Sequence, residues 1–337
     1  MSIRFRVLGG PTSDNGLYVE VDTGQSISRL LFDCGEGVPT AVPFGDLIQL
    51  DHLFQSHGHM DHMAGFATLL RRVYSGAGSR PVIWGPEGTA VLMQHQMRGF
   101  LWNLVADATD AFRLVDVLPS EVRTVESRLA EAYATRYDVA TVPREPVLYR
   151  GRGFDVEAAD MDHGSVSLAY IVREHTRTNV DAAAMLAMGL KPGPWMKDLK
   201  DGQDGALMVE VAGTLVSMDT LREQLLIRAP GGSVAYCTDF LLDEAAMERL
   251  LPALRGVDTL VCEAQYRHED LPLAIANRHM TSVQVATLAK EAGVGELILI
   301  HVSGRYTAAE RQLLLEEAQA VFPARYPDGW SQGTGHG

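Results

Sequence analysis

Three imidazoles and a carboxylate fall within the six residues HGHMDH, as His57, His59, Asp61 and His62. Neutral imidazole and ionised carboxylate are the ordinary ligands of zinc and similar divalent cations. A chance surface cluster is the alternative, because a single histidine is more often an exposed or hydrogen-bonded side chain than a ligand. The segment therefore predicts a metal site if other parts of the chain deliver further ligands to it.

Further ligand-type residues follow three later segments that we expect to be strands. His163 follows FDVEAADMD, Asp239 follows SVAYCT, and His301 follows ELILI. The carboxyl ends of neighbouring strands in an open α/β sheet form a common binding edge, so these side chains should gather beside HGHMDH. Seven ligands exceed the three or four that one zinc ion takes. We therefore expect two ions, with a carboxylate able to bridge them.

Two more segments carry groups that suit the same edge. DCGEG follows the predicted strand RLLF, and its Asp33 is expected to support the metal loop, with an ordinary β-turn as the alternative. Glu263 follows the predicted strand DTLVC, and His279 precedes a predicted helix. A carboxylate raises the pKa of an adjacent imidazole and fixes its tautomer, so this pair suits a general acid. A surface glutamate and a helix cap are the alternative for the pair.

The elements that must position these groups are those of a mixed α/β fold. Short apolar runs, many of them β-branched, alternate with segments of helical spacing. The expected strands are RFRVLG, LYVEV, RLLFD, HLFQS, PVIWG, FDVEAAD, LAYIV, SVAYCTD, DTLVCEA and ELILIHV. The expected helices cover residues 61–74, 87–105, 120–136, 243–251, 281–292 and 307–321.

One stretch, residues 174–205, interrupts this alternation. Its KPGP sequence cannot continue a helix, and strand-like segments resume on both sides of the stretch. We therefore expect a protruding arm within a single domain of residues 1–330, followed by a flexible tail at residues 331–337. The arm is neutral, because residues 173–205 hold five basic and five acidic side chains.

Composition limits the classes of function. The chain of 337 residues has 29 Lys and Arg against 43 Asp and Glu, a formal charge of −14, which disfavours general adhesion to anionic polymers or membranes. Three widely spaced cysteines match neither a disulfide framework nor a CxxC zinc site. Neither a membrane-spanning apolar run nor a secretion signal is evident, so we expect no membrane association and a cytoplasmic location.

Together these motifs resemble the metallo-β-lactamase superfamily and, within it, the tRNA 3′-endonuclease (RNase Z) branch. HGHMDH carries the superfamily resemblance. The branch resemblance rests on DCGEG, HGSVSLAY at 163–170, CEA at 262–264, HMTSVQ at 279–284 and HVSGRY at 301–306. LAMGLKPGPWMKDLKDG resembles the Gly-Pro-containing arm with which that branch grips tRNA. The resemblance covers nearly the full chain and implies an αββα sandwich with the metals at one edge, commonly as a homodimer.

The resemblance also implies a role for each motif residue. The first metal would be held by His57, His59 and His163, and the second by Asp61, His62 and His301, with Asp239 bridging. Glu263 and His279 would form a proton-relay pair near the leaving group, while Asp61 would orient or deprotonate the nucleophile. Ser167 and Tyr170 would support the site. Substrate-binding residues of the arm would be Lys191, Gly193, Pro194, Lys197 and Lys200.

The implied reaction is hydrolysis of precursor tRNA just beyond the acceptor stem, with two zinc ions, or manganese or iron in their place. Because each phosphate contact generally needs a cation or a backbone donor, the neutral arm predicts modest, salt-sensitive RNA affinity. A small-molecule hydrolase on the same scaffold, such as a phosphodiesterase, arylsulfatase or lactonase acting on an ester, is the first alternative. A metal-stabilised binding protein without catalysis is the second.

Overall fold

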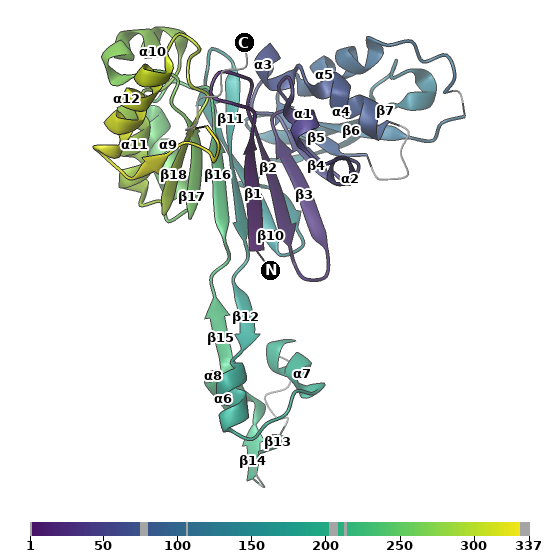
Figure 1. Cartoon of the computed structure of the whole chain (residues 1–337). Coiled ribbons are helices and arrows are strands. Elements are labelled where there is room, and N and C mark those ends of the chain that lie inside the picture. Colours follow the sequence, from purple (N-terminus) through teal and green to yellow (C-terminus); the bar gives the residue numbers. More distant parts are fainter. Residues whose placement is uncertain (1, 75–79, 106, 202–207, 212–213, 331–337) are drawn as a thin grey trace. The chain divides into compact units, whose positions relative to one another are not determined.

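The chain forms two units in the computed structural model, one inserted in the sequence of the other (Figure 1). The structure describes residues 2–74, 80–105, 107–201, 208–211 and 214–330. The first unit comprises the described residues up to Arg173 and from Gly232 onward, and the second comprises those within Glu174–Gly231. The inserted unit thus extends past the predicted arm end at residue 205. The predicted tail at 331–337 and positions 202–205 of the predicted arm lie outside the described residues.

The first sheet of the first unit has eight strands in the order of the chain. They are β1 (Ser2–Leu8), β2 (Gly16–Asp22), β3 (Ile27–Phe32), β4 (His52–Phe54), β5 (Val82–Pro86), β6 (Ala111–Val117), β7 (Glu121–Arg128) and β8 (Tyr137–Pro143). The neighbours from β3 to β6 are parallel. The outer pairs are antiparallel.

The second sheet has seven strands in the order β19-β18-β17-β16-β11-β10-β9. They are β9 (Val147–Gly151), β10 (Phe154–Asp162), β11 (Val166–Glu174), β16 (Ser233–Cys237), β17 (Thr259–Glu263), β18 (Glu296–Ile300) and β19 (Ala324–Arg325). Strands β16 to β19 are parallel. All five residues of β17 are buried, as expected for a parallel strand that is covered on both faces.

Helices cover the outer face of each sheet (Figure 1). On the first sheet these are α1 (Val38–Ala41), α2 (Phe44–Leu47), α3 (Met60–Met63), α4 (Phe66–Val73) and α5 (Thr89–Arg98). On the second they are α9 (Glu244–Leu254), α10 (Leu271–Asn277), α11 (Ser282–Ala292) and α12 (Ala308–Gln319). A third apolar cluster, including Phe32, Tyr170 and Ile298, joins the two sheets. The predicted αββα sandwich is confirmed.

Local sequence signals explain where the helices that flank the site begin and end. Thr281 and Gln284 form a capping box at the start of α11, and Gly293 ends that helix in the left-handed conformation. The predicted helix at 61–74 is divided into α3 and α4 at Gly65. A Cβ there would lie 2.1 Å from the carbonyl oxygen of Gly35, so only glycine permits this close approach.

The predicted helix at 120–136 is wrong. Residues Glu121–Arg128 form β7, which pairs with β6 on one side and β8 on the other. The short 3-10 turn η1 (Leu129–Glu131) follows it. The charged residues of this stretch fit a helical pattern, but Val122 and Val125 are buried in the sheet, with a register shift between Thr124 and Val125. Strand pairing therefore overrides a weak local preference.

The second unit has a hydrophobic core of its own. Strand β12 (Arg177–Val180) pairs with β15 (Leu226–Ala229), and β13 (Met208–Val211) pairs with β14 (Thr214–Ser217). Its helices are α6 (Ala182–Ala187), α7 (Trp195–Asp201) and α8 (Met218–Leu225). Its buried core consists of Met185, Leu190, Leu199, Met218, Leu221 and Leu225. Met185, Leu190 and Leu199 of the predicted arm thus find partners within this unit, whereas Leu186 is largely exposed.

Membrane insertion finds no support in the helices that the structure describes. None of these helices is both long enough and apolar enough to span a bilayer.

Candidate metal centre

Seven ligand-type residues come together where strands of both sheets end. The residues His57, His59, Asp61 and His62 lie in the connection from β4 and in α3. His163 follows β10, Asp239 follows β16, and His301 follows β18. These seven residues are called the candidate metal centre below.

The carboxylate of Asp239 lies in the middle of the candidate metal centre. Its Oδ2 atom is 4.0 Å from Nε2 of His57, 3.8 Å from Nε2 of His163 and 3.4 Å from Nε2 of His62. On its other side, Oδ1 is 3.3 Å from Nδ1 of His301. Asp239 therefore faces residues from both of the ligand groups that the sequence predicts.

Two groups of potential ligands meet at this carboxylate. His57, His59 and His163 have ligand atoms within 4.8 Å of one another. The residues of a second such group are Asp61, His62, Asp239 and His301. A third group replaces Asp61 and His62 by Glu263 and His279. Because Glu263 already accepts hydrogen bonds from two imidazoles there, the first two groups suit metal ions better.

The Nδ1 atoms of the imidazoles contact partners that can hold the rings in place. His62 Nδ1 lies 2.7 Å from Oδ2 of Asp33, and His163 Nδ1 lies 2.8 Å from the carbonyl oxygen of Arg278. His57 Nδ1 is 3.0 Å from the hydroxyl of Ser56. Such contacts fix the tautomer and leave Nε2 available to a metal.

Asp33 connects the metal loop to both sheets. Its Oδ1 accepts the backbone N–H of Ser56 at 2.7 Å. Its Oδ2 accepts the hydroxyls of Ser56 at 2.7 Å and Tyr236 at 3.1 Å. In the same DCGEG turn, a Cβ at Gly35 would lie 2.2 Å from the carbonyl oxygen of Asp61. A glycine is therefore required where this turn touches the metal loop.

Two buried nitrogens test whether the centre fits a metal. Nε2 of His57 and Nε2 of His62 are buried and have no hydrogen-bond partner in the described structure. Leaving a buried polar atom unsatisfied costs about 1–3 kcal/mol, so such atoms are rare unless a ligand uses them. Both face the Asp239 carboxylate. The donor set of imidazoles and carboxylates therefore fits a divalent cation.

The pKa values of the potential ligands also bear on metal binding. Burial lowers the pKa of His57 to about 3, so this ring is neutral at pH 7. Burial also opposes charge on Asp239, but the imidazole of His301 holds its pKa well below the ordinary value. A hydrogen bond to His301 lowers the pKa of Asp61 as well. His57 and the two carboxylates thus have the forms that bind metal. Burial opposes charge on His62 and His301, but Asp239 raises the pKa of both, so these two rings lose a proton when a cation binds.

Glu263 and His279 form the predicted pair beside the centre. Oε2 of the fully buried Glu263 lies 2.9 Å from Nδ1 of His279 and 3.2 Å from Nδ1 of His301. Burial opposes a charge on His279, but Glu263 raises its pKa above the ordinary value. The ring of His279 lies 4.9 Å from that of His163. Glu263 therefore favours the charged form of an imidazole at the edge of the candidate metal centre.

Other predicted residues lie outside the centre. Ser167 donates to the carbonyl oxygen of Thr238 at 3.2 Å, and Tyr170 donates to that of Gln55 at 2.8 Å. Both buried hydroxyls thus hold backbone next to the ligand-bearing segments. The five predicted arm residues, Lys191, Gly193, Pro194, Lys197 and Lys200, belong to the second unit. Its three lysines are exposed.

Sequence reasoning missed several supporting groups. Ser56 adjoins HGHMDH and was within reach of a search for hydroxyls beside ligands. Tyr236 lies in a predicted strand, where its contact with Asp33, 203 residues away, left no local signal. The carbonyl of Arg278 is a backbone atom, placed by a left-handed φ of 57°. No side-chain pattern reports such a group.

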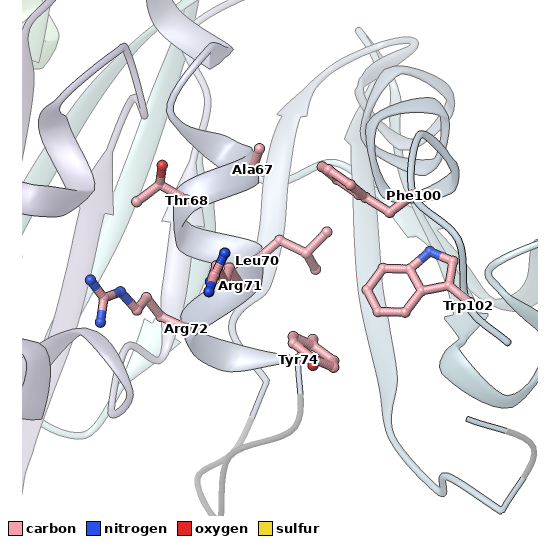
Figure 2. A pocket seen from close by; sticks show the side chains of 8 residues that line it. All are labelled: Ala67, Thr68, Leu70, Arg71, Arg72, Tyr74, Phe100 and Trp102. Carbon is pink, nitrogen blue, oxygen red and sulfur yellow. The ribbon is translucent and has the colours of Figure 1, made fainter. Parts of the chain in front are cut away.

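A cavity of about 610 Å³ lies apart from these residues, against α4 (Figure 2). Leu70 of α4 points toward Trp102, which comes from the segment after α5 together with Phe100 (Figure 2). Arg71, Arg72 and Tyr74 also line the cavity. None of its lining residues is a predicted site residue, so the cavity is not the site of the metal chemistry.

Known proteins resemble the chain in sequence. The profile described as "Metallo-beta-lactamase superfamily" matches residues 19–135. A protein named Ribonuclease Z from Deinococcus radiodurans is 41% identical over 329 residues, which cover 97% of this chain and 98% of the relative. A Ribonuclease Z from a Synechococcus strain is 31% identical over 306 residues, covering 87% of this chain and 82% of the relative.

A solved structure shows the same fold. The metallo-beta-lactamase fold protein YhfI from Bacillus subtilis superposes with a TM-score of 0.55 at 16% identity, covering 97% of this chain and 96% of that one. At this identity the likeness concerns the arrangement of the sheets and helices. The sequence relatives carry the information about family.

Proposed function

Because the chain belongs to the ribonuclease Z family of the metallo-β-lactamase superfamily, we propose that it is a metal-dependent endoribonuclease that removes the 3′ trailer of precursor tRNA. The identity of 41% over 97% of the chain favours an RNA substrate over the small-molecule alternative. A binding protein without catalysis would have no need of a buried carboxylate that raises the pKa of an imidazole beside the centre.

The position of Asp239 is the observation that carries the proposal. Its carboxylate lies within 4.0 Å of Nε2 atoms from both ligand groups, as a bridging ligand requires. We assign His57, His59 and His163 to one ion and Asp61, His62 and His301 to the other. Nitrogen and oxygen ligands in these numbers suit zinc, with manganese and iron as weaker candidates.

The protein's own residues direct the reaction around these ions. When bound, the cations supply Lewis acidity that polarises the phosphodiester and lowers the pKa of water in the site. Asp61, whose side chain is 45% exposed, orients the attacking water or accepts its proton. Attack at phosphorus breaks the bond to the 3′-oxygen, so the tRNA keeps a 3′-hydroxyl and the trailer keeps a 5′-phosphate.

The leaving oxygen needs a proton, and His279 supplies it. Glu263 fixes Nδ1 of His279 at 2.9 Å, which leaves Nε2 free to face the departing group. The carboxylate also raises the pKa of this imidazole, which favours the protonated form that a general acid requires. Glu263 is fully buried and cannot reach substrate itself.

The second unit supplies the tRNA grip in this proposal. Lys191, Lys197 and Lys200 are exposed within 10 residues of sequence, and Gly193 and Pro194 lie between them. The unit's own hydrophobic core gives these side chains a folded support. Since the acidic and basic residues of the predicted arm balance, we expect affinity to depend strongly on salt.

Parallel substrates test the function. The zinc-loaded protein is incubated with a 3′-extended precursor tRNA, bis-p-nitrophenyl phosphate, an aryl sulfate and a lactone. We expect cleavage of the tRNA just beyond the acceptor stem, and loss of both metal and cleavage in the His59→Ala variant. Rapid turnover of a small ester with intact precursor tRNA would contradict the RNA assignment.

Two features favour a cytoplasmic enzyme. Cys34, Cys237 and Cys262 are all free and buried, so the fold needs no oxidising compartment. A precursor-tRNA substrate would meet the enzyme where transcripts are made. We therefore place the protein in the cytoplasm.

An exposed apolar surface supports the proposed homodimer. Phe44, Phe100, Leu101 and Leu104 are 57%, 49%, 85% and 90% exposed. Phe44 and Phe100 line two cavities that share Arg72, and Figure 2 shows the cavity with Phe100. Large contiguous apolar patches mark interaction surfaces, and we propose that these four side chains belong to one such patch. Sedimentation equilibrium should give a dimer for the wild type and a monomer for Leu101→Lys. A monomeric wild type at micromolar concentration would contradict the homodimer.

A further inference from the structure

Three residues of the site are held in an uncommon backbone conformation. Asp33, Asp239 and His301 have φ values of 58°, 43° and 52°, in the left-handed region that favours glycine. Each follows the carboxyl end of a central strand, namely β3, β16 and β18. A residue in such a conformation costs on the order of 1–3 kcal/mol and persists only where its surroundings enforce it. At His301, contacts of the backbone and of the imidazole enforce this conformation.

The backbone N–H of His301, at the turn that follows β18, donates to a side chain. Strand β18 ends at Ile300, and the carbonyl of Ile300 already accepts the N–H of Ala264 at 2.9 Å. A backbone N–H in a buried position must find another acceptor. The side-chain oxygen of Asn15 provides it at 2.9 Å, across 286 residues of sequence.

The side chain of Asn15 is itself held in place by burial and by a second hydrogen bond. Its side chain is only 1% exposed, and its amide nitrogen donates to the carbonyl oxygen of Gly10 at 3.0 Å. Because that nitrogen is used, the oxygen must face His301. Gly9 has a φ of 92°, and a Cβ there would lie 2.0 Å from the Asp14 carbonyl oxygen and 2.8 Å from Nδ2 of Asn15. A glycine at position 9 is therefore required for the loop backbone to approach the Asn15 side chain this closely.

The same histidine belongs to the second ligand group. Nε2 of His301 lies 3.4 Å from Oδ2 of Asp61, and its Nδ1 lies 3.2 Å from Oε2 of Glu263. A small rotation of the His301 backbone would move both contacts. The acceptor on the N–H thus governs where the imidazole points.

We infer that Asn15 is a positioning residue that sets the His301 imidazole for the second metal ion by accepting its backbone N–H. This inference rests on the proposed two-metal function. Asn15 contacts neither ion nor substrate in this account and acts only through His301. Partners of this kind are worth about 10- to 100-fold in metal affinity when they are removed.

The experiment measures metal binding, apart from activity. The full-length wild type and the variants Asn15→Ala, Asn15→Asp and Ser13→Ala are titrated with zinc against a chromophoric chelator. For Asn15→Ala we expect one ion to bind as in the wild type and the other about 10- to 100-fold more weakly. Turnover on precursor tRNA should then recover as free zinc is raised.

Two variants separate positioning from a general loss of structure. Asn15→Asp keeps an oxygen for the His301 N–H but loses the donor to Gly10, so its second ion should bind more tightly than in Asn15→Ala. Ser13→Ala removes the 2.6 Å bond to the N–H of Gly10 in the same loop and should bind both ions as the wild type does. Circular dichroism shows that each variant is folded.

Three results would overturn the inference. They are wild-type affinity for both ions in Asn15→Ala, equal weakening in Asn15→Asp and Asn15→Ala, or equal weakening in Ser13→Ala and Asn15→Ala. A wild-type protein that binds no second ion would instead contradict the proposed function itself, so the two failures are distinguishable.

Discussion

Three imidazoles of the candidate metal centre are oriented by chemically different partners. A carboxylate contacts His62, a hydroxyl contacts His57 and a backbone carbonyl contacts His163. Ligand-type side chains were predictable because they directly follow recognisable strands. Their partners were less predictable, since a carbonyl such as that of Arg278 carries no residue-type signal. The sequence therefore predicts the metal ligands better than it predicts the hydrogen-bond partners that orient them.

The acid role of His279 is tested by its removal. In His279→Ala the leaving 3′-oxygen has no proton donor, so kcat should fall by about 10²- to 10⁴-fold. Zinc content should stay at the wild-type value, because His279 lies outside the two proposed ligand groups. Unchanged kcat in a metal-replete variant would show that another group protonates the leaving oxygen.

The charge of Glu263 makes a separate prediction about pH. Glu263 raises the pKa of His279, so the imidazole stays protonated, and active as an acid, to a higher pH than an unperturbed histidine. Glu263→Gln removes that charge and should move the alkaline fall of kcat to lower pH. Profiles of kcat against pH test this, with zinc content measured alongside because Glu263 also contacts His301. An unmoved alkaline limb would contradict the proposed coupling.

At the scale of elements, strand pairing determined whether a segment forms a helix or a strand where the local sequence pattern was ambiguous. The runs ELILI and TLVCE were predictable as strands because each has an uninterrupted apolar centre. In contrast, EVRTVESR spaces its valines three residues apart, as a helix would, and becomes β7 through its two neighbours. The end of the inserted unit was missed for a similar reason. Its last strand, β15, is defined by pairing with β12, whose residues lie 46 to 52 positions earlier in the sequence.

Strand β4, which precedes the metal loop, begins with the buried His52. This histidine should make the stability of the fold depend on pH. Burial lowers the pKa of His52 to about 4 from 6.5, and its Nδ1 accepts the Trp84 indole N–H at 3.0 Å. Between these two values the unfolded chain binds the extra proton. The free energy of unfolding should therefore fall as pH drops from 6.5 toward 4, by roughly 3 kcal/mol in all.

A variant isolates that contribution. His52→Gln cannot titrate in this range but offers Trp84 an acceptor. Urea denaturation at several pH values should show less acid destabilisation for His52→Gln than for the wild type. Identical pH dependence in the two proteins would mean that His52 is not buried as a neutral ring.

At the scale of the whole molecule, the negative net charge opposes RNA binding, whereas local positive charges favour it. A chain of formal charge −14 must bind a polyanion through local cations, and the proposed ones lie in the second unit. The family and the αββα fold were both predictable from motifs spread along the chain. The core of the second unit was not predictable, because its apolar residues come from segments far apart in the insertion and follow no regular spacing.

Replacing the unit's lysines tests the RNA grip. The triple variant Lys191→Ala, Lys197→Ala and Lys200→Ala should raise KM for precursor tRNA and reduce the slope of log affinity against log salt by about 2 to 3. Its turnover of bis-p-nitrophenyl phosphate should not change, and Lys290→Ala on α11 serves as the matched control. Equal effects on the small diester and on tRNA would argue against a role confined to RNA binding.

The central claim is that distant segments deliver their ligands to a common pair of ions, and anomalous diffraction at the zinc edge tests it most directly. Crystals of the zinc-loaded protein should show two anomalous peaks on either side of Asp239. One should lie among His57, His59 and His163, and the other among Asp61, His62 and His301. A protein that cleaves precursor tRNA while its crystals show no peak beside Asp239 would contradict the account.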